Sequence, residues 1–262
     1  MRQFKSQHVI MFFAAILLFG SCMGEGRNVM TTTMFGVIRF DYGRMKNVLD
    51  VGEIESLYNI EFQTAQEGDC FWVYYELDYD IPENSYENSI DAKGNAIYTV
   101  TLLQKESVEP GNVYTYIMDT TRVLIDEIPI IDPIIEGTFW YVKGKFFILC
   151  SLEIPNNQDM SWHLSYDYDN LATEENYQRV YNVYLRTNIR DKGTKTPEKV
   201  TCPVVFDLKN YLQLAAQHEK SLEGTSITIR FNYPSAISED GNITWSNTGT
   251  DIQQIQVSYF VE

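Results

Sequence analysis

Short segments that alternate apolar and polar residues follow one another from residue 34 to the end of this 262-residue chain. In residues 57–64, Tyr58, Ile60 and Phe62 alternate with polar residues, which is the period-two pattern of a strand with one buried face. Residues 70–77 form a nearly continuous apolar run and predict another strand. The remaining strands are expected at residues 97–105, 113–118, 138–142, 145–153, 160–166, 179–187, 226–231 and 252–261. The sequence therefore predicts an all-β protein.

One short helix is expected among these strands, at residues 207–218. Its apolar residues Leu208, Tyr211, Leu212 and Ala215 recur at the spacing of one helix face. Asp207 precedes them and suits the N-cap position, where a carboxylate accepts free backbone N–H groups.

The N-terminus carries an uninterrupted apolar run at residues 9–19, preceded by Arg2 and Lys5. Eleven helical residues span only ~16 Å, which is too short for a bilayer core of about 30 Å. The run therefore indicates a secretory signal peptide, residues 1–21, rather than a membrane-spanning helix.

Small residues and then Cys22 follow this run, and the pattern resembles a bacterial lipoprotein signal. In such proteins the cysteine is diacylated, becomes the new N-terminus and anchors the chain durably, because two acyl chains hold it in the membrane. The alternative is an ordinary signal peptide with an incidental cysteine. We expect lipidation of Cys22, a flexible tether at residues 22–33 and an outer-membrane location. A single early acid, Glu25, leaves open whether the protein faces the periplasm or the cell surface.

Two β domains are expected in the mature chain. Five strands and one polar loop at residues 80–95 suit a small Greek-key barrel of the oligonucleotide/oligosaccharide-binding (OB) shape about as well as an irregular sandwich, and we prefer the barrel. Pro129 and Pro133 favour an extended connector. The expected boundaries are an OB-like barrel at 34–125, a connector at 126–137 and a β-sandwich at 138–262.

These segments, in this order, resemble the NigD-like lipoproteins of Bacteroidetes over residues 34–260. The resemblance implies an N-terminal OB-like domain and a C-terminal β-sandwich behind a lipidated cysteine, and it implies no activity. It is carried by short motifs at residues 67–69, 71–75, 120–125, 132–134, 139–142, 146–150, 163–167, 183–188 and 204–208.

The charge balance argues against nucleic acid as a partner. The chain has 20 basic and 36 acidic residues, a formal net charge of −16, whereas phosphate contacts need clustered Lys and Arg. Removal of residues 1–21 takes away Arg2 and Lys5 and no acid, so the mature chain carries −18.

Cys70, Cys150 and Cys202 remain after processing. Three thiols cannot all pair within one chain, so at least one is free or pairs with another molecule, and the sequence leaves their pairing open.

No group of residues indicates catalysis. His163 suits a half-exposed or hydrogen-bonded strand position, and His218 lies near the helix C-terminus, where a cation is favourable. The acidic runs at residues 76–80 and 167–170 lack the glycine of a calcium loop and are typical of solvated turns. We therefore expect no enzyme activity, no cofactor and no metal site.

Aromatic residues are the one surplus, with 18 Tyr and 14 Phe. Trp72 and Tyr74 share one strand face and are expected in a core, whereas Tyr86, Tyr166 and Tyr168 fall in expected loops and could stack on a sugar. Residues 119–121 resemble the acceptor triplet of Bacteroidetes O-glycosylation, with Thr120 as the acceptor.

Two functions are compatible with these features. The first is a non-enzymatic, lipid-anchored envelope protein that binds another protein, as an interaction or assembly module of the outer membrane. The alternative is a glycan-binding surface lipoprotein that uses exposed aromatic residues. The sequence leaves open whether the two domains form a shared cleft.

Overall fold

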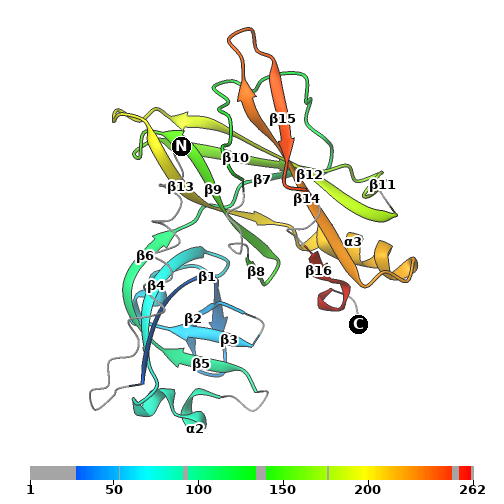
Figure 1. Ribbon diagram of the computed structural model, residues 1–262. Coiled ribbons are helices and arrows are strands. Elements are labelled where there is room, and N and C mark those ends of the chain that lie inside the picture. Colours follow the sequence, from blue (N-terminus) through cyan, green and yellow to red (C-terminus); the bar gives the residue numbers. More distant parts are fainter. Residues whose placement is uncertain are drawn as a thin grey trace, which may run out of the picture.

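Two β domains, one barrel and one sandwich, stack along the long axis of the molecule (Figure 1). The computed structural model describes residues 28–52, 54–90, 94–133, 140–175, 177–249 and 254–260. The signal peptide and Cys22 lie outside these residues. No helix within the described residues is long and apolar enough to cross a membrane.

The first domain is a closed barrel. Its sheet runs in the order β5-β3-β2-β1-β4-β6, and only Val100 separates β5 from β6, so the two ends of the sheet are one bent strand. The β3–β5 pair is parallel and the other pairs are antiparallel, which is the five-stranded OB topology. The barrel is thus confirmed over the irregular sandwich. The strands are β1 (Val29–Asp41), β2 (Lys46–Asp50), β3 (Glu55–Tyr58), β4 (Cys70–Asp78), β5 (Ala96–Thr99) and β6 (Thr101–Ser107).

Residues 57–64 do not form the single strand that their alternation predicts. β3 ends at Tyr58 and a 3-10 turn, η1 (Ile60–Thr64), follows. The Asn59 side chain accepts the Glu61 amide, which offers the backbone a turn in place of the sheet. Ile60 consequently faces solvent, with 70% of its surface exposed, while Phe62 is buried.

The expected loop at residues 80–95 contains two short helical turns, η2 (Pro82–Asn84) and α2 (Tyr86–Ser89). Asn84 is buried and anchors this excursion to the barrel. Its amide group donates to the carbonyls of Asp78 and Thr99 (both 2.8 Å).

The second domain is a sandwich of a larger and a smaller sheet around the largest core. The larger sheet runs β15-β14-β12-β10-β7, with β11 on β12 and β16 on β14, and the smaller runs β13-β9-β8. Its elements are β7 (Asn112–Tyr114), β8 (Trp140–Val142), β9 (Lys145–Ile154), β10 (Asp159–Ser165), β11 (Thr173–Glu175), β12 (Gln178–Asp191), β13 (Glu198–Asp207), α3 (Lys209–Ser221), β14 (Ser226–Ile237), β15 (Ile243–Asn247), β16 (Gln254–Gln256) and η3 (Val257–Tyr259).

The predicted helix is α3, and its predicted apolar face is buried against the sandwich core. The helix begins two residues later than expected, because Asp207 is the last residue of β13 and Leu208 occupies the N-cap position. The Asp207 carboxylate still accepts the Lys209 amide (3.3 Å).

The element boundaries differ from the expected ones at both ends of the barrel. β1 already begins at Val29, so residues 29–33 are strand rather than tether. β7 pairs in parallel with β10, so residues 112–114 join the sandwich sheet rather than the barrel in which they were expected. At the C-terminus, the expected strand 252–261 is reduced to β16 and η3 within the described residues.

An apolar interface joins the domains, and the described part of the expected connector packs on the sandwich, where Ile130 is buried in the core. Phe35 of β1 lies with its ring centroid 5.0 Å from that of Phe147 and 5.0 Å from that of Trp140, both in the sandwich. Phe35, Phe147 and Val205 are fully buried in this cluster. Because burial of such surface is the main favourable term in folding, the two domains hold one another in a defined orientation.

Candidate binding groove between the domains

A groove of about 390 Å³ lies where the barrel meets the sandwich. The two domains therefore form a shared cleft. Its volume falls in the range of ligand sites, which occur preferentially at domain interfaces. One side consists of residues 106–109, at the end of β6, and the opposite side of residues 200–203 of β13; the first residues of β10 and Arg190 of β12 complete it.

The side formed by β13 is a strand edge. Four consecutive residues, 200–203, line the groove, although successive side chains of a strand point to opposite faces. β13 pairs with β9 on its other side and is the last strand of its sheet. The groove therefore runs along the edge of β13 and faces its backbone as well as its side chains.

Among the charged side chains of the groove, acidic ones outnumber basic ones. Its charged lining residues are Glu106, Glu109, Asp159 and Arg190. Arg190 binds both Asp159 (Nε to Oδ2, 2.5 Å) and Glu109 (Nη1 to Oε2, 2.9 Å), and these hydrogen bonds raise its pKa. The hydrogen bonds from Arg190 also lower the pKa of Asp159. Glu106 forms no ion pair with any described residue and lies exposed.

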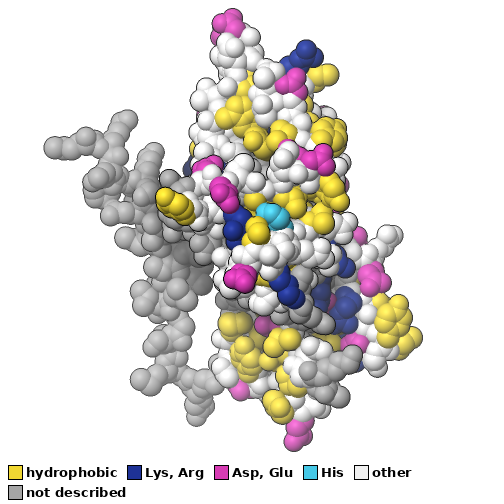
Figure 2. All heavy atoms as spheres, turned by 90° about the vertical axis from the view of Figure 1, so that its right-hand side faces the viewer, with side chains coloured by type: hydrophobic (Ala, Val, Ile, Leu, Met, Phe, Trp, Pro, Cys, Tyr) yellow, Lys and Arg dark blue, Asp and Glu magenta, His cyan; other side chains and the backbone are white. Residues whose placement is uncertain are grey.

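The acidity of the groove is part of a charge that is spread over the molecule. On the face shown in Figure 2, acidic side chains are scattered from one end to the other. The groove combines this acidity with apolar lining residues, Val108, Met160 and Trp162, of which Trp162 is 8% exposed.

A second, smaller hollow of about 120 Å³ adjoins the groove and shares Glu106 with it. It is lined by Trp72 and Tyr74, which were expected in a core. Trp72 is half-buried beside the domain interface, but Tyr74 is 40% exposed on the outer face of the barrel. The expectation is therefore wrong for Tyr74.

The Cys202 thiol also lines the groove. Burial, and secondarily the Glu106 carboxylate, raises its pKa to about 11. A thiol of this pKa is almost entirely protonated at neutral pH and is a poor nucleophile. All three cysteines that the structure describes, Cys70, Cys150 and Cys202, are free thiols.

The predicted stacking residues do not come together. Tyr86 lies on α2 of the barrel and is 81% exposed, whereas Tyr168 is 53% exposed on the sandwich. Tyr166 is only 4% exposed and packs on Tyr211 with a centroid distance of 4.3 Å. Tyr166 therefore belongs to the sandwich core and cannot present a ring to a sugar, because its face is already covered.

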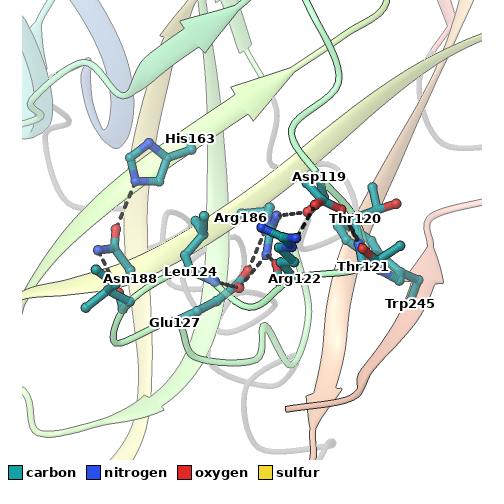
Figure 3. Close-up of polar contacts among 11 residues, drawn as sticks. Asp119, Thr120, Thr121, Arg122, Leu124, Glu127, His163, Arg186, Asn188 and Trp245 are labelled. Atoms are coloured by element: carbon teal, nitrogen blue, oxygen red, sulfur yellow. Dashed lines mark hydrogen bonds and ion pairs between the residues drawn. The ribbon is translucent and has the colours of Figure 1, made fainter.

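Thr120, the predicted glycosylation residue, lies in a tight turn on the sandwich (Figure 3). Asp119 Oδ1 accepts the amide and the hydroxyl of Thr121 (2.9 and 2.6 Å), and the Thr120 carbonyl accepts the Trp245 indole N–H (3.1 Å). Thr120 is half-buried there, and its glycosylation stays a prediction.

Beneath this turn lies a buried ion pair that sequence reasoning missed (Figure 3). Arg186 binds both Glu127 oxygens at 2.6 Å and also donates to the carbonyls of Asp119 (2.8 Å) and Arg122 (2.6 Å). It ties residues 119–127 to β12. The signal in the sequence was a lone Arg in an apolar strand, which needs a partner when buried.

Both histidines among the described residues have hydrogen-bond partners. His163 Nε2 lies 2.9 Å from Asn188 Oδ1, as expected for a hydrogen-bonded strand residue (Figure 3). His218 lies in the last turn of α3, as expected, and its Nδ1 lies 2.8 Å from the Tyr181 hydroxyl. Within the described residues, no three His, Cys, Asp or Glu side chains gather in a way that could hold a metal ion.

Comparison with known proteins shows that the first domain is similar to one family. Residues 26–106 match the family model of the lipoprotein OB domain. No curated protein matches the chain.

Solved structures share the two-domain fold. An uncharacterised protein from Parabacteroides merdae ATCC 43184 matches 86% of this chain and 99% of its own, with 16% identity and a TM-score of 0.69. A protein of unknown function from Bacteroides vulgatus ATCC 8482 matches 89% and 99%, with 14% identity and a TM-score of 0.50. A NigD-like immunity protein from Bacteroides caccae ATCC 43185 matches 84% and 93%, with 14% identity and a TM-score of 0.45. The expected similarity of the first domain to a lipoprotein OB domain is thus confirmed, and the fold of the whole chain is shared with the Parabacteroides merdae protein.

Proposed function

We propose that this chain is a non-enzymatic, lipid-anchored protein of the outer membrane that binds another protein in the groove between its domains. The observation that carries the proposal is the groove itself, a concave strand edge held open between two domains that an apolar interface locks together. The lipoprotein family matched by residues 26–106 supports an envelope location.

The anchor is tested by fractionation. We expect Cys22→Ser to move the protein from the membrane fraction to the soluble fraction, because the acyl chains are lost. Retention of this variant in the membrane would contradict lipidation at Cys22. Proteinase K added to intact cells, with a periplasmic control protein, then decides which face carries the domains.

Binding in the groove is tested by photo-crosslinking in intact cells. A benzophenone amino acid replaces the exposed groove residue Asn156, and in a control strain it replaces Tyr177, a fully exposed turn residue that does not line the groove. We expect a discrete adduct with one envelope protein from position 156 alone. An absent adduct at position 156, or the same adduct from both positions, would contradict the proposal.

Glycan binding is a second candidate, favoured by the exposure of Tyr86. Its helical turn borders a hollow of about 240 Å³ on the barrel, lined by Arg44, Lys46 and Asn88 among others. Loops at this end of OB barrels hold oligosaccharides in other proteins. We expect Tyr86→Ala to reduce retardation in polysaccharide-containing gels while the melting temperature stays unchanged; equal retardation would remove this role.

A further inference from the structure

The backbone of β13 offers unused hydrogen-bonding groups along the groove. In an extended strand, the N–H and C=O of one residue point to one side and those of the next residue to the other. The Val205 carbonyl accepts the Gly111 amide (2.8 Å), on the side away from β9. Because the register between β13 and β9 is continuous, the backbone groups of Thr201 and Lys199 point away from β9 as well.

The partner strand confirms this alternation independently. Ser151 of β9 stands opposite Thr201, and its amide donates to the Asp132 carbonyl (2.7 Å) on the far side of β9. Ser151 and Thr201 are therefore a pair that does not exchange backbone hydrogen bonds. Within the described residues, no backbone group bonds to the outward N–H or C=O of Thr201.

A short strand addition already exists at one end of this edge. Pro110 forms an isolated parallel bridge with Val205, next to the bond from the Gly111 amide. Residues 106–109 belong to the barrel side of the groove and leave the edge of β13. The edge from Pro203 back to Val200 is thereby left facing the groove, and Lys199 follows on the same edge. Pro203 offers only an acceptor there, since it has no N–H to donate.

The side chains around the edge indicate the chemistry of the occupant. Three carboxylates and one guanidinium line the groove, and the guanidinium is already paired with two of the carboxylates, which leaves Glu106 without a partner among the described residues. Met160 and Trp162 of β10 add apolar side chains to the lining. An added strand presents alternate side chains to opposite faces, so one set would meet carboxylates and the other apolar side chains.

We infer that the groove takes an extended segment of the partner protein, with alternating basic and apolar side chains, which adds as a strand to the free edge of β13. This inference rests on the proposed function and names its mode of binding. Main-chain hydrogen bonds to Thr201 and Lys199 supply affinity, as in other cases of strand addition, and Glu106 selects for positive charge.

The test uses a synthetic heptapeptide, acetylated and amidated, in which valines alternate with lysine and threonine. It is titrated into the full mature protein by calorimetry, and amide exchange at Thr201 is followed by NMR. We expect saturable binding below about 1 mM, slowed exchange of the Thr201 amide, and no binding of the same peptide with glutamate in place of lysine. Absence of binding, or binding without slower exchange at Thr201, would overturn the inference.

Two variants separate backbone pairing from charge. Thr201→Pro removes an outward N–H that the pairing with β9 does not use, and proline is tolerated at strand edges. We expect it to weaken binding by about tenfold or more, a loss of at least one hydrogen bond. Glu106→Gln should weaken binding at low salt only, whereas Glu174→Gln, on the exposed strand β11, should leave it unchanged.

A third reagent guards against misfolding of the variants. Two versions of the heptapeptide carry N-methyl groups on alternate amides, one on the odd-numbered residues and the other on the even-numbered residues. Each version lacks the hydrogen-bond donors along one of its two edges. One of the two methylated peptides should fail to bind the unaltered protein, and equal binding of both would contradict strand addition. If position 156 gives an adduct in cells but the peptide does not bind, only this mode of binding is contradicted. If neither the adduct nor peptide binding is found, the proposed function is contradicted as well.

Discussion

Arg186 and Arg190 lie on the same strand, four residues apart, and both hold carboxylates, yet their surroundings differ completely. The side chains of Arg186 and Glu127 are 1% and 0% exposed, whereas those of Arg190 and Asp159 are 50% and 46% exposed. An exposed pair competes with water and salt, while a buried charge without its partner is strongly unfavourable.

We expect Glu127→Gln to destabilise the protein by about 3–5 kcal/mol, because it leaves the Arg186 guanidinium buried without a counter-charge. Asp159→Asn, the matched change at the exposed pair, should lower stability far less. Urea unfolding of both variants measures the difference. Similar unfolding midpoints for the two would show that the Arg186 pair does not hold residues 119–127 to β12.

The cysteine thiols provide a second prediction for single side chains. Burial raises the pKa of Cys70 and of Cys202 to about 11, and that of Cys150 well above its usual value. At pH 8 only ~0.1% of a thiol with a pKa near 11 is thiolate. We expect iodoacetamide to alkylate the folded mature domains roughly a hundredfold more slowly than the urea-unfolded chain; a rapid reaction of any one thiol, followed by mass spectrometry, would contradict its burial.

At the level of single elements, the backbone of β1 is constrained because this strand pairs with two different strands. It pairs with β4 through residues 29–37 and with β2 through residues 37–41, and so bends where the two pairings meet. Gly36 lies at this bend, and a Cβ there would lie 2.7 Å from the Asp50 carbonyl oxygen and 2.5 Å from Leu49 Cγ. Barrel closure thus depends on the absence of a side chain at one position.

We expect Gly36→Ala to cost about 1–3 kcal/mol, because a backbone atom of β2 would have to move. Gly52→Ala is the matched control, since its Cβ would meet only Glu55 Cβ at 3.9 Å. Thermal unfolding of both variants tests this. A Gly36→Ala protein as stable as the Gly52→Ala protein would show that β1 can shift to make room.

The strand pattern was a good guide to elements whose side chains alternate between a core and water, and a poor one elsewhere. It located β4, β9 and β10, because each buries one face or nearly both, and the helical spacing located α3 for the same reason. β13 was missed, although Val200, Cys202, Val204 and Phe206 alternate along it. Pro203 obscured this strand and, in the structure, marks it as an edge, where a missing N–H costs no bond.

For the molecule as a unit, we expect the packed aromatic side chains between the domains to determine how it unfolds. Phe35, Phe147 and Trp140 come from both domains, and the groove exists only while they remain packed. An interface of buried apolar side chains couples the unfolding of the domains it joins.

We expect a single calorimetric transition for the mature protein and two separate transitions for Phe35→Ala, which removes a buried ring at a cost of about 3–5 kcal/mol. Tyr42→Ala, at an exposed aromatic residue of the barrel, should keep the single transition. One unchanged transition in the Phe35→Ala protein would mean that the domains are coupled by other contacts.

Local pattern was sufficient for the class of the protein, the order of barrel and sandwich, and the helix. Each of these depends on residues close together in the chain, whose periodicity reports whether one face is buried. Local pattern did not predict four features: the groove, the pairing of β7 with the sandwich sheet, the Arg186–Glu127 pair and the burial of Tyr166. They arise where segments more than forty residues apart pack together, and a single sequence carries no signal of which distant partner a strand edge, a charge or a ring will meet.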